Sequence, residues 1–126
     1  MEPFVISGTL KTPTIVFNPD GNMILKGKSI PESVFRLYTP AIQWIEELKA
    51  EYVTFNVDLE YINSASKVML LELFRVLEAN ENVKHIILNW HYDIEDEDNL
   101  DIGKIFEESL IRSRFTYVGY VASYNS

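Results

Sequence analysis

The chain has 126 residues, 47% of them hydrophobic, and its 11 Lys and Arg against 19 Asp and Glu give a net charge of −8. This length suits a single domain over residues 1–126, because one hydrophobic core commonly spans about 100 to 150 residues. The negative charge repels a phosphate backbone and anionic lipid. We therefore expect neither nucleic acid nor a membrane as a partner.

Cysteine content and the N-terminus narrow the class of protein further. The sequence has no cysteine, which excludes disulfides, thiolate zinc sites and thiol nucleophiles. Residues 1–7 have neither a basic start nor an apolar stretch of signal-peptide length. No segment approaches the roughly 20 apolar residues of a membrane span. We expect a cytoplasmic protein.

The first half of the chain predicts a hairpin and an amphipathic helix. Two β-prone runs, Thr14–Phe17 and Asn22–Lys26, flank Asn18–Gly21, whose Pro, Asp and Gly suit a tight turn. We expect the main part of the helix to begin at Pro40, with Thr39 as its N-cap. Its apolar residues recur at three- and four-residue spacing: Phe35, Tyr38, Ile42, Ile45 and Leu48.

The second half alternates strands and helices. Tyr52–Leu59 alternates apolar and polar residues, which predicts a strand with one buried face, and Ala65–Ala79 follows as a helix. This helix has few polar positions, so we expect it to be buried on more than one side or against a partner. A strand over Val83–Trp90, a helix after the acidic segment Asp93–Asp101 and a strand over Phe115–Val121 follow. The order β-β-α-β-α-β-α-β predicts an α/β fold, with parallel strand pairs joined by right-handed crossovers.

Two motifs superficially match known sites, and neither fits. Gly27–Ser29 resembles the end of a phosphate-binding loop, but Pro31 follows where a helix must continue. The spacing of Ser64 and Lys67 is that of penicillin-binding enzymes, but the companion Ser-Asp-Asn and Lys-Thr-Gly elements are missing. We therefore expect no nucleotide or other cofactor and no acyl transfer.

The histidines and the acidic segment leave a small enzyme as one alternative. His85 and His91 are six residues apart, so along one strand they would point to the same face. His91, with Asp93 or Glu95, would serve as acid and base. The run from Asp93 to Asp101 lacks the glycine and terminal glutamate of a calcium loop, so we expect no metal there. It favours a solvated helix start, or a surface for a basic partner.

The strand-to-helix junction offers hydroxyl groups where backbone amides lack partners. Asn63 and Ser64 both suit an N-cap, and we expect Ser64 to take that role, so that its loss would cost about 1 kcal/mol. The same position suits a phosphate, because phosphoserine adds about −1.5 to −2 charges at the positive end of the helix dipole. Lys67, one turn on, would supply a counter-charge.

Two blocks of the sequence, Tyr61–Ser66 and Trp90–Asp93, are specific enough to suggest a family. A fainter likeness extends over nearly the whole chain, through Gly8-Thr9, Thr12-Pro13, Ile30–Ser33, Tyr38, Pro40 and Trp44. Together these residues resemble the SiaC family of bacterial regulatory phosphoproteins, whose fold is similar to the STAS type. The resemblance implies a STAS-like single domain, with helices packed on a central mixed sheet.

The resemblance also implies a function, in which the protein is a switch and not an enzyme. In that family a SiaB-like, histidine-kinase-like serine/threonine kinase phosphorylates a hydroxyl at the helix start, and a metal-dependent serine/threonine phosphatase removes the phosphate. The unphosphorylated form binds and activates a diguanylate cyclase, so biofilm behaviour responds to the phosphate. The implied acceptor is Ser64, with Ser66 as the alternative. The implied partner surface comprises Asn63, Ser64, Ala65, Lys67, Val68 and Leu71.

A constitutive interaction module is the remaining alternative. In that case Ser64 only caps the helix, and partner binding is indifferent to phosphate.

Overall fold

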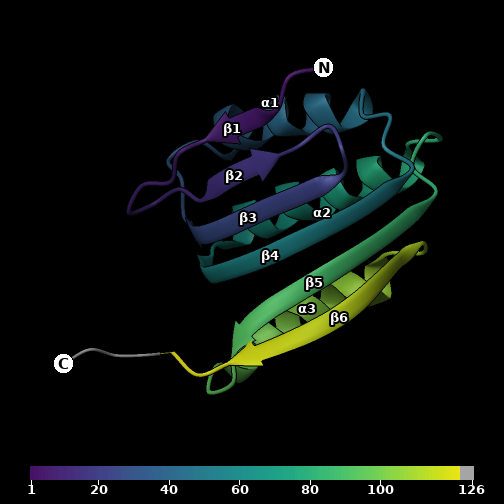
Figure 1. The fold of residues 1–126 in the computed structure, drawn as a ribbon. Helices are drawn as coiled ribbons and strands as arrows, with labels where there is room; N and C mark the ends of the chain where they lie inside the picture. The colour runs from purple at the N-terminus through teal and green to yellow at the C-terminus, as the bar shows by residue number, and fades with distance from the viewer. Residues whose placement is uncertain (123–126) are drawn as a thin grey trace.

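The computed structural model describes residues 1–122, in which a sheet carries helices on one of its faces (Figure 1). Residues 123–126 of the predicted domain lie outside the described residues. The strands follow one another across the sheet in chain order: β1 (Phe4–Ile6), β2 (Thr14–Phe17), β3 (Asn22–Ser29), β4 (Tyr52–Ile62), β5 (His85–Asp93) and β6 (Ser113–Tyr120). The helices are α1 (Val34–Glu46), α2 (Ser64–Ala79) and α3 (Glu97–Ser109).

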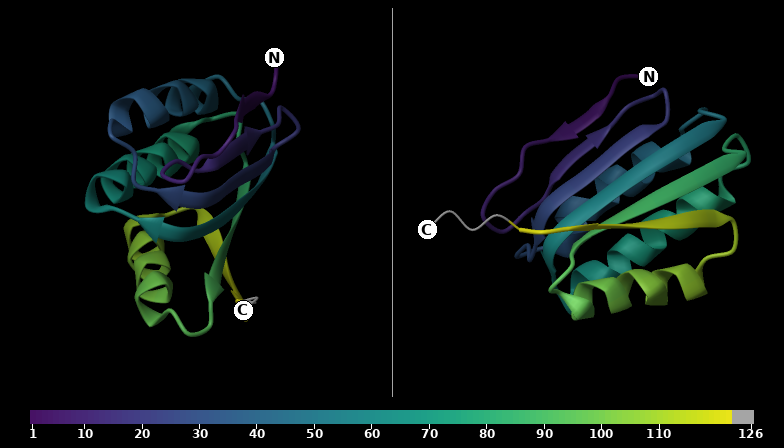
Figure 2. Two further views of the ribbon diagram at one scale, coloured as in Figure 1. Left: turned by 90° about the vertical axis from the view of Figure 1, so that its left-hand side faces the viewer. Right: turned by 60° about the horizontal axis from the view of Figure 1, so that its bottom comes forward.

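The connections between strands decide where the helices lie. β1, β2 and β3 pair antiparallel, whereas β3 to β6 are parallel and are joined in turn by α1, α2 and α3. Because the crossovers step along the sheet in one direction with one handedness, they place every helix on the same face. Figure 2 shows α2 between α1 and α3 on that face. The predicted α/β fold with a mixed central sheet is confirmed.

The predicted alternation of β4 is also confirmed. Val53, Phe55 and Val57 are buried beneath the helices, while Thr54 and Asn56 are half-exposed on the opposite face. The Phe55 ring lies 5.4 Å from that of Phe17 in β2, centroid to centroid. The core therefore lies between the helices and one face of the sheet, and the other face is open to solvent.

Helix α2 is buried on several sides, as its composition predicted. The ring of Phe74 lies 5.3 Å from Phe55 in β4 and 5.8 Å from Phe106 in α3, centroid to centroid. The same helix packs against α1. Only its outer stripe reaches solvent, where Val68 is 69% exposed. None of the helices within residues 1–122 is long and apolar enough to cross a membrane.

The start of α1 differs from the prediction. Ser33 is the N-cap and accepts a hydrogen bond from the amide of Arg36 at 3.4 Å, and Pro40 lies inside the helix. The prediction of Thr39 as N-cap and Pro40 as the first helical residue was wrong. Pro40 is exposed, so the carbonyl that loses its helical partner lies on the solvent side. Burial of Tyr38 stabilises the turn before it.

The bounds of β5 differ less from the predicted ones. Strand β5 runs His85–Asp93 in place of the predicted Val83–Trp90, so His91 lies within the strand. One residue of the predicted apolar stripe, Phe35, is 68% exposed.

Trp90 joins β5 to α3 through a fitted contact. Its indole N–H donates to the carbonyl of Asn99 at 3.1 Å, and the Asn99 amide donates to the carbonyl of Leu59 at 2.9 Å. Gly103 lies against the indole, where an added Cβ would come within 2.8 Å of the ring. Because the first bond holds the ring and the second holds its partner Asn99, the ring has little room to shift.

We predict that Gly103→Ala destabilises the protein. Overpacking costs about 1–3 kcal/mol, which exceeds the gain of up to about 1 kcal/mol that alanine brings to a helix. Urea denaturation should show a loss of about 1–2 kcal/mol in the free energy of unfolding. Asp101→Ala, on the exposed side of α3, should change it by less than about 0.5 kcal/mol. Unchanged stability of Gly103→Ala would contradict the contact.

Candidate functional site

The last residues of β4 are turned outward by a β-bulge. Gly27 and Lys28 of β3 pair with Leu59 and Tyr61 of β4, which leaves Glu60 as the extra residue. Gly27 has φ +121°, a conformation that favours glycine. Because the bulge interrupts the alternation, Glu60 and Tyr61 are both exposed, Tyr61 by 64%.

Asn63 begins α2 by capping it. Its side-chain oxygen accepts from the amide of Ser66 at 2.9 Å, and its carbonyl accepts from the amide of Lys67 at 3.0 Å. Its own amide donates to the carbonyl of Ser29 at 3.0 Å, which ties the cap to the end of β3. The prediction that Ser64 is the N-cap was wrong, because this bond fixes the extended cap conformation at position 63. Ser64 is the first helical residue.

Ser64 lies on the surface at the positive end of the α2 dipole. Its side chain is exposed. Within residues 1–122, the backbone amides of Ser64 and Ala65 donate no hydrogen bond. Free amides at a helix start stabilise an anion nearby. The position can therefore carry a negatively charged group without disturbing the cap.

Ser66 has the opposite environment, because it is fully buried. Its hydroxyl donates to the carbonyl of Ser29 at 3.1 Å and accepts from the Ser29 hydroxyl at 2.9 Å. The Tyr38 hydroxyl completes this chain, 2.6 Å from the oxygen of Ser29. Burial raises the pKa of Tyr38, and the bonds with Ser29 and Ser66 act in the other direction. The neutral phenol is therefore the donor that begins the chain.

The structure brings the other predicted partner residues together on the first turns of α2. Ala65 and Val68 are exposed, and Lys67 and Leu71 are half-buried. Ser64 and Val68 are four residues apart and so lie on one face of the helix. Tyr61 was not among the predicted residues. The signal that marks its outward position is Gly27, since a glycine within a strand often indicates a bulge.

The predicted acid–base pair does not form a site of its own. His91 lies on the open face of the sheet, with its Nε2 3.2 Å from the side-chain oxygen of Asn56. A carboxylate oxygen of Asp93 accepts from the amide of Glu95 at 3.0 Å, within the following turn. Five cavities of about 310–630 Å³ within residues 1–122 have neither His91 nor Ser64 in their linings.

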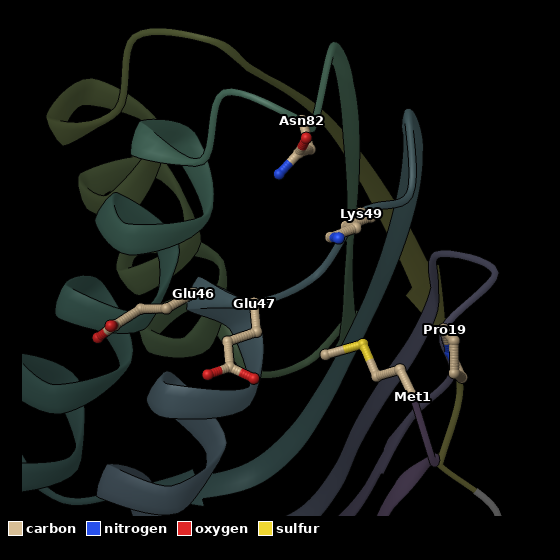
Figure 3. Close-up of a pocket in the computed structure, with 6 residues that line it drawn as sticks. All are labelled: Met1, Pro19, Glu46, Glu47, Lys49 and Asn82. Carbon is tan, nitrogen blue, oxygen red and sulfur yellow. The ribbon is translucent and has the colours of Figure 1, made fainter.

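A cavity of about 630 Å³ lies at the C-terminal end of α1 (Figure 3). Its side chains surround open space instead of converging, and Glu46 points away from Met1. It is lined by Met1, Pro19, Glu46, Glu47, Lys49 and Asn82. This arrangement offers no common centre for a reacting group.

The acidic segment forms the start of α3. Asp96 is the N-cap and accepts from the amide of Asn99 at 3.0 Å, while Glu97 and Asp98 are exposed in the first turn. Residues 1–122 contain no group of three or more His, Cys, Asp or Glu placed to hold a metal ion. The segment is the exposed helix start that the sequence predicted, and its use as a surface for a basic partner stays a prediction.

Known proteins match the chain over most of its length. A family model described as "SiaC family regulatory phosphoprotein" matches residues 6–120. A protein of Pseudomonas aeruginosa strain UCBPP-PA14 is 28% identical over 113 residues, which cover 86% of this chain and 90% of that protein.

Solved structures match as well. SiaC of Pseudomonas aeruginosa is 26% identical, with a TM-score of 0.84 over 95% of this chain and 100% of that one. A chain in the crystal structure of the diguanylate cyclase SiaD in complex with its activator SiaC, from the same species, is 26% identical. Its TM-score is 0.83, and the match covers 93% of this chain and 99% of that one. The resemblance that Tyr61–Ser66 and Trp90–Asp93 suggested is confirmed, and the chain belongs to the SiaC family of regulatory phosphoproteins.

Proposed function

We propose that this chain is a cytoplasmic, non-enzymatic switch protein that is phosphorylated on Ser64. Its unphosphorylated form binds and activates a diguanylate cyclase. The contact is made by the switch surface, which comprises Asn63, Ser64, Ala65, Lys67, Val68 and Leu71. The observation that carries the proposal is the exposed Ser64 hydroxyl at the first residue of α2, beside the exposed Val68.

The choice of Ser64 over Ser66 rests on access to the hydroxyl. A kinase must reach a hydroxyl and place it in line with the phosphate of its nucleotide. The Ser66 hydroxyl is buried and holds two hydrogen bonds with Ser29, so modifying it would require opening the first turn of α2. The Ser64 hydroxyl is free at the surface, and the dipole of α2 favours the product.

We propose a diguanylate cyclase as the partner because of the family to which the chain belongs. SiaC of Pseudomonas aeruginosa is the activator in a complex with the diguanylate cyclase SiaD, and its chain superposes on this one almost completely. On the same family ground we propose a SiaB-like kinase and a metal-dependent serine/threonine phosphatase as the enzymes that set the state of Ser64. The kinase supplies the nucleotide and its metal.

A phosphate on Ser64 would act at the surface and leave the fold intact. It adds about −1.5 to −2 charges one helical turn from the apolar side chain of Val68. A partner that buries Val68 would have to desolvate this charge or move away. Each 1.4 kcal/mol of lost contact weakens binding about tenfold.

The alternative of a constitutive interaction module assigns Ser64 the role of N-cap, but Asn63 caps α2. That alternative therefore gives no reason for a serine at position 64. The small-enzyme alternative rests on His91 as acid or base. The contact of His91 is with the side chain of Asn56, and the carboxylate of Asp93 binds the amide of Glu95, so neither contact favours this alternative.

We predict that Ser64→Ala folds normally and accepts no phosphate from its kinase. Because Asn63 makes the cap, the free energy of unfolding should change by less than about 0.5 kcal/mol. Asn63→Ala should cost about 1 kcal/mol by urea denaturation. Ser66→Ala should cost about 1–3 kcal/mol, because it removes two buried hydrogen bonds with Ser29, yet it should still be phosphorylated. Phosphate on Ser64→Ala at the wild-type level, measured by intact mass, would contradict the assignment.

We predict that Val68→Ala weakens binding to a purified diguanylate cyclase about fivefold or more, because the two methyl groups that alanine lacks are worth about 0.8 kcal/mol each when buried. Isothermal titration calorimetry measures the affinity. Val5→Ala is the matched control, since Val5 is 62% exposed on β1, far from α2. Equal losses in the two variants would contradict a contact at the switch surface.

A further inference from the structure

Cations of this acidic chain gather at the edge of the sheet opposite Ser64. A cavity of about 330 Å³ lies at the amino ends of β4, β5 and β6, and we refer to it as the basic edge cavity. It is lined by Tyr52, Lys84, His85, Ile86, Ile87, Arg112 and Arg114, none of them acidic. The other four cavities described within residues 1–122 each include an aspartate or glutamate. In a chain of net charge −8, this composition is unusual.

The charges in the basic edge cavity are not cancelled by ion pairs. Within residues 1–122, none of Lys84, Arg112 and Arg114 forms a salt bridge. The Arg112 guanidinium donates to the carbonyl of Glu78 at 2.6 and 2.8 Å and to the carbonyl of Val83 at 3.1 Å. The Lys84 ammonium likewise donates to a backbone carbonyl. Carbonyl groups hold these side chains in place but leave their charge uncompensated.

The nearby carboxylate of Glu78 is hydrogen-bonded to backbone amides and, in the described part of the chain, does not pair with these cations. It accepts from the amides of Ile111, Arg112 and Ser113 at 2.7–2.9 Å. Burial acts to raise the pKa of Glu78, but these hydrogen bonds outweigh it and hold the pKa below its ordinary value. The ionised carboxylate therefore fixes the segment that leads into β6, with Arg112 just before the strand and Arg114 as its second residue.

The remaining wall of the cavity is flat and partly apolar. The rings of Tyr52 and His85 stack with centroids 4.8 Å apart and an interplanar angle of 11°. Ile87, which pairs with Arg114 across β5 and β6, is 41% exposed on the same open face of the sheet. The cavity thus combines separate cationic groups with a surface suited to aliphatic or peptide atoms.

The position of the cavity argues against a compact oxyanion. Helix α2 ends at this edge, as the bond from Arg112 to the carbonyl of Glu78 shows, so carbonyl groups and not the free amides of a helix start lie beside the cavity. A phosphate group concentrates its charge at one point and prefers a helix start. The cations here are spread over Lys84, Arg112 and Arg114, which suits carboxylates spaced along a chain.

We infer that the basic edge cavity binds an acidic, Asp- and Glu-rich segment of a protein partner. The carboxylates of that segment pair with Arg114 and Lys84, and its backbone and aliphatic atoms lie on Ile87 and the Tyr52–His85 stack. This site does not depend on Ser64. It lies at the opposite edge of the sheet and would hold a partner in either phosphorylation state.

Fluorescence anisotropy tests the inference with the full chain and a fluorescein-labelled ten-residue peptide of alternating Glu and Asp. We expect saturable binding that weakens with salt, and none for the Gln and Asn version of the peptide. Arg114→Ala and Lys84→Ala should each weaken binding about two- to fivefold, since an exposed ion pair is worth about 0.2–1 kcal/mol. Lys104→Ala is the matched control, because it removes the same charge from an exposed position on α3.

Several results would overturn the inference. An equal loss in Lys104→Ala would show that only net charge matters. Binding of the neutral peptide would remove the role of the carboxylates. Displacement of the acidic peptide by stoichiometric pyrophosphate would make the cavity a small-oxyanion site. Self-association of the chain in size-exclusion chromatography, lost in Arg114→Ala, would make its occupant a second copy of this chain.

Discussion

The hydrogen bonds that tie Ser66 to Ser29 determine where α2 begins and what its first turn exposes. Ser29 ends β3, and its carbonyl accepts from the amide of Asn63 and from the hydroxyl of Ser66. The cap and the first buried residue of the helix are thus both held by one carbonyl of the sheet. Ser64 lies between these anchors and is left free at the surface. In the switch surface that we propose, Ser64 is exposed because the residues on either side of it, Asn63 and Ser66, are held by the sheet.

The one-sided sheet explains why a switch at this point can act without unfolding the protein. α2 lies between α1 and α3 and rests on β4, so its inner residues are held from several directions (Figure 2). Its outer stripe touches none of them, and Val68 is 69% exposed. A charge added on this stripe changes what a partner meets and leaves the core as it was. Proteins that regulate by contact need this separation of surface from core.

Strong periodicity made much of the fold predictable. The alternation in Tyr52–Leu59 and the helical pattern in Ala65–Ala79 are set by burial, so both elements form there, although β4 runs on to Ile62 and α2 begins at Ser64. The helix starts were less predictable, because Ser33, Thr39, Asn63 and Ser64 all have side chains suited to an N-cap. The choice among them is made by tertiary contacts, such as the bond from Asn63 to Ser29.

The role of Ser64 as an acceptor stays a prediction, but its exposure at the start of α2 was predictable from the strand-to-helix junction. The burial of Ser66 was not, because its partners Ser29 and Tyr38 are 37 and 28 positions away in the sequence. The outward turn of Tyr61 depends on the bulge opposite Gly27, which no local pattern in β4 indicates. The cations of the basic edge cavity likewise come together only in the folded sheet, since Tyr52 lies far along the chain from Arg114.

The affinity of the cyclase for the two forms of Ser64 tests the central claim most directly. The same preparation of the chain, unphosphorylated and stoichiometrically phosphorylated on Ser64 as mapped across Tyr61–Lys67, would be titrated into a purified diguanylate cyclase. A switch at this surface predicts that the phosphorylated form binds about tenfold more weakly or worse, which corresponds to 1.4 kcal/mol or more. Equal affinity of the two forms would contradict it and would leave the chain a constitutive binding module.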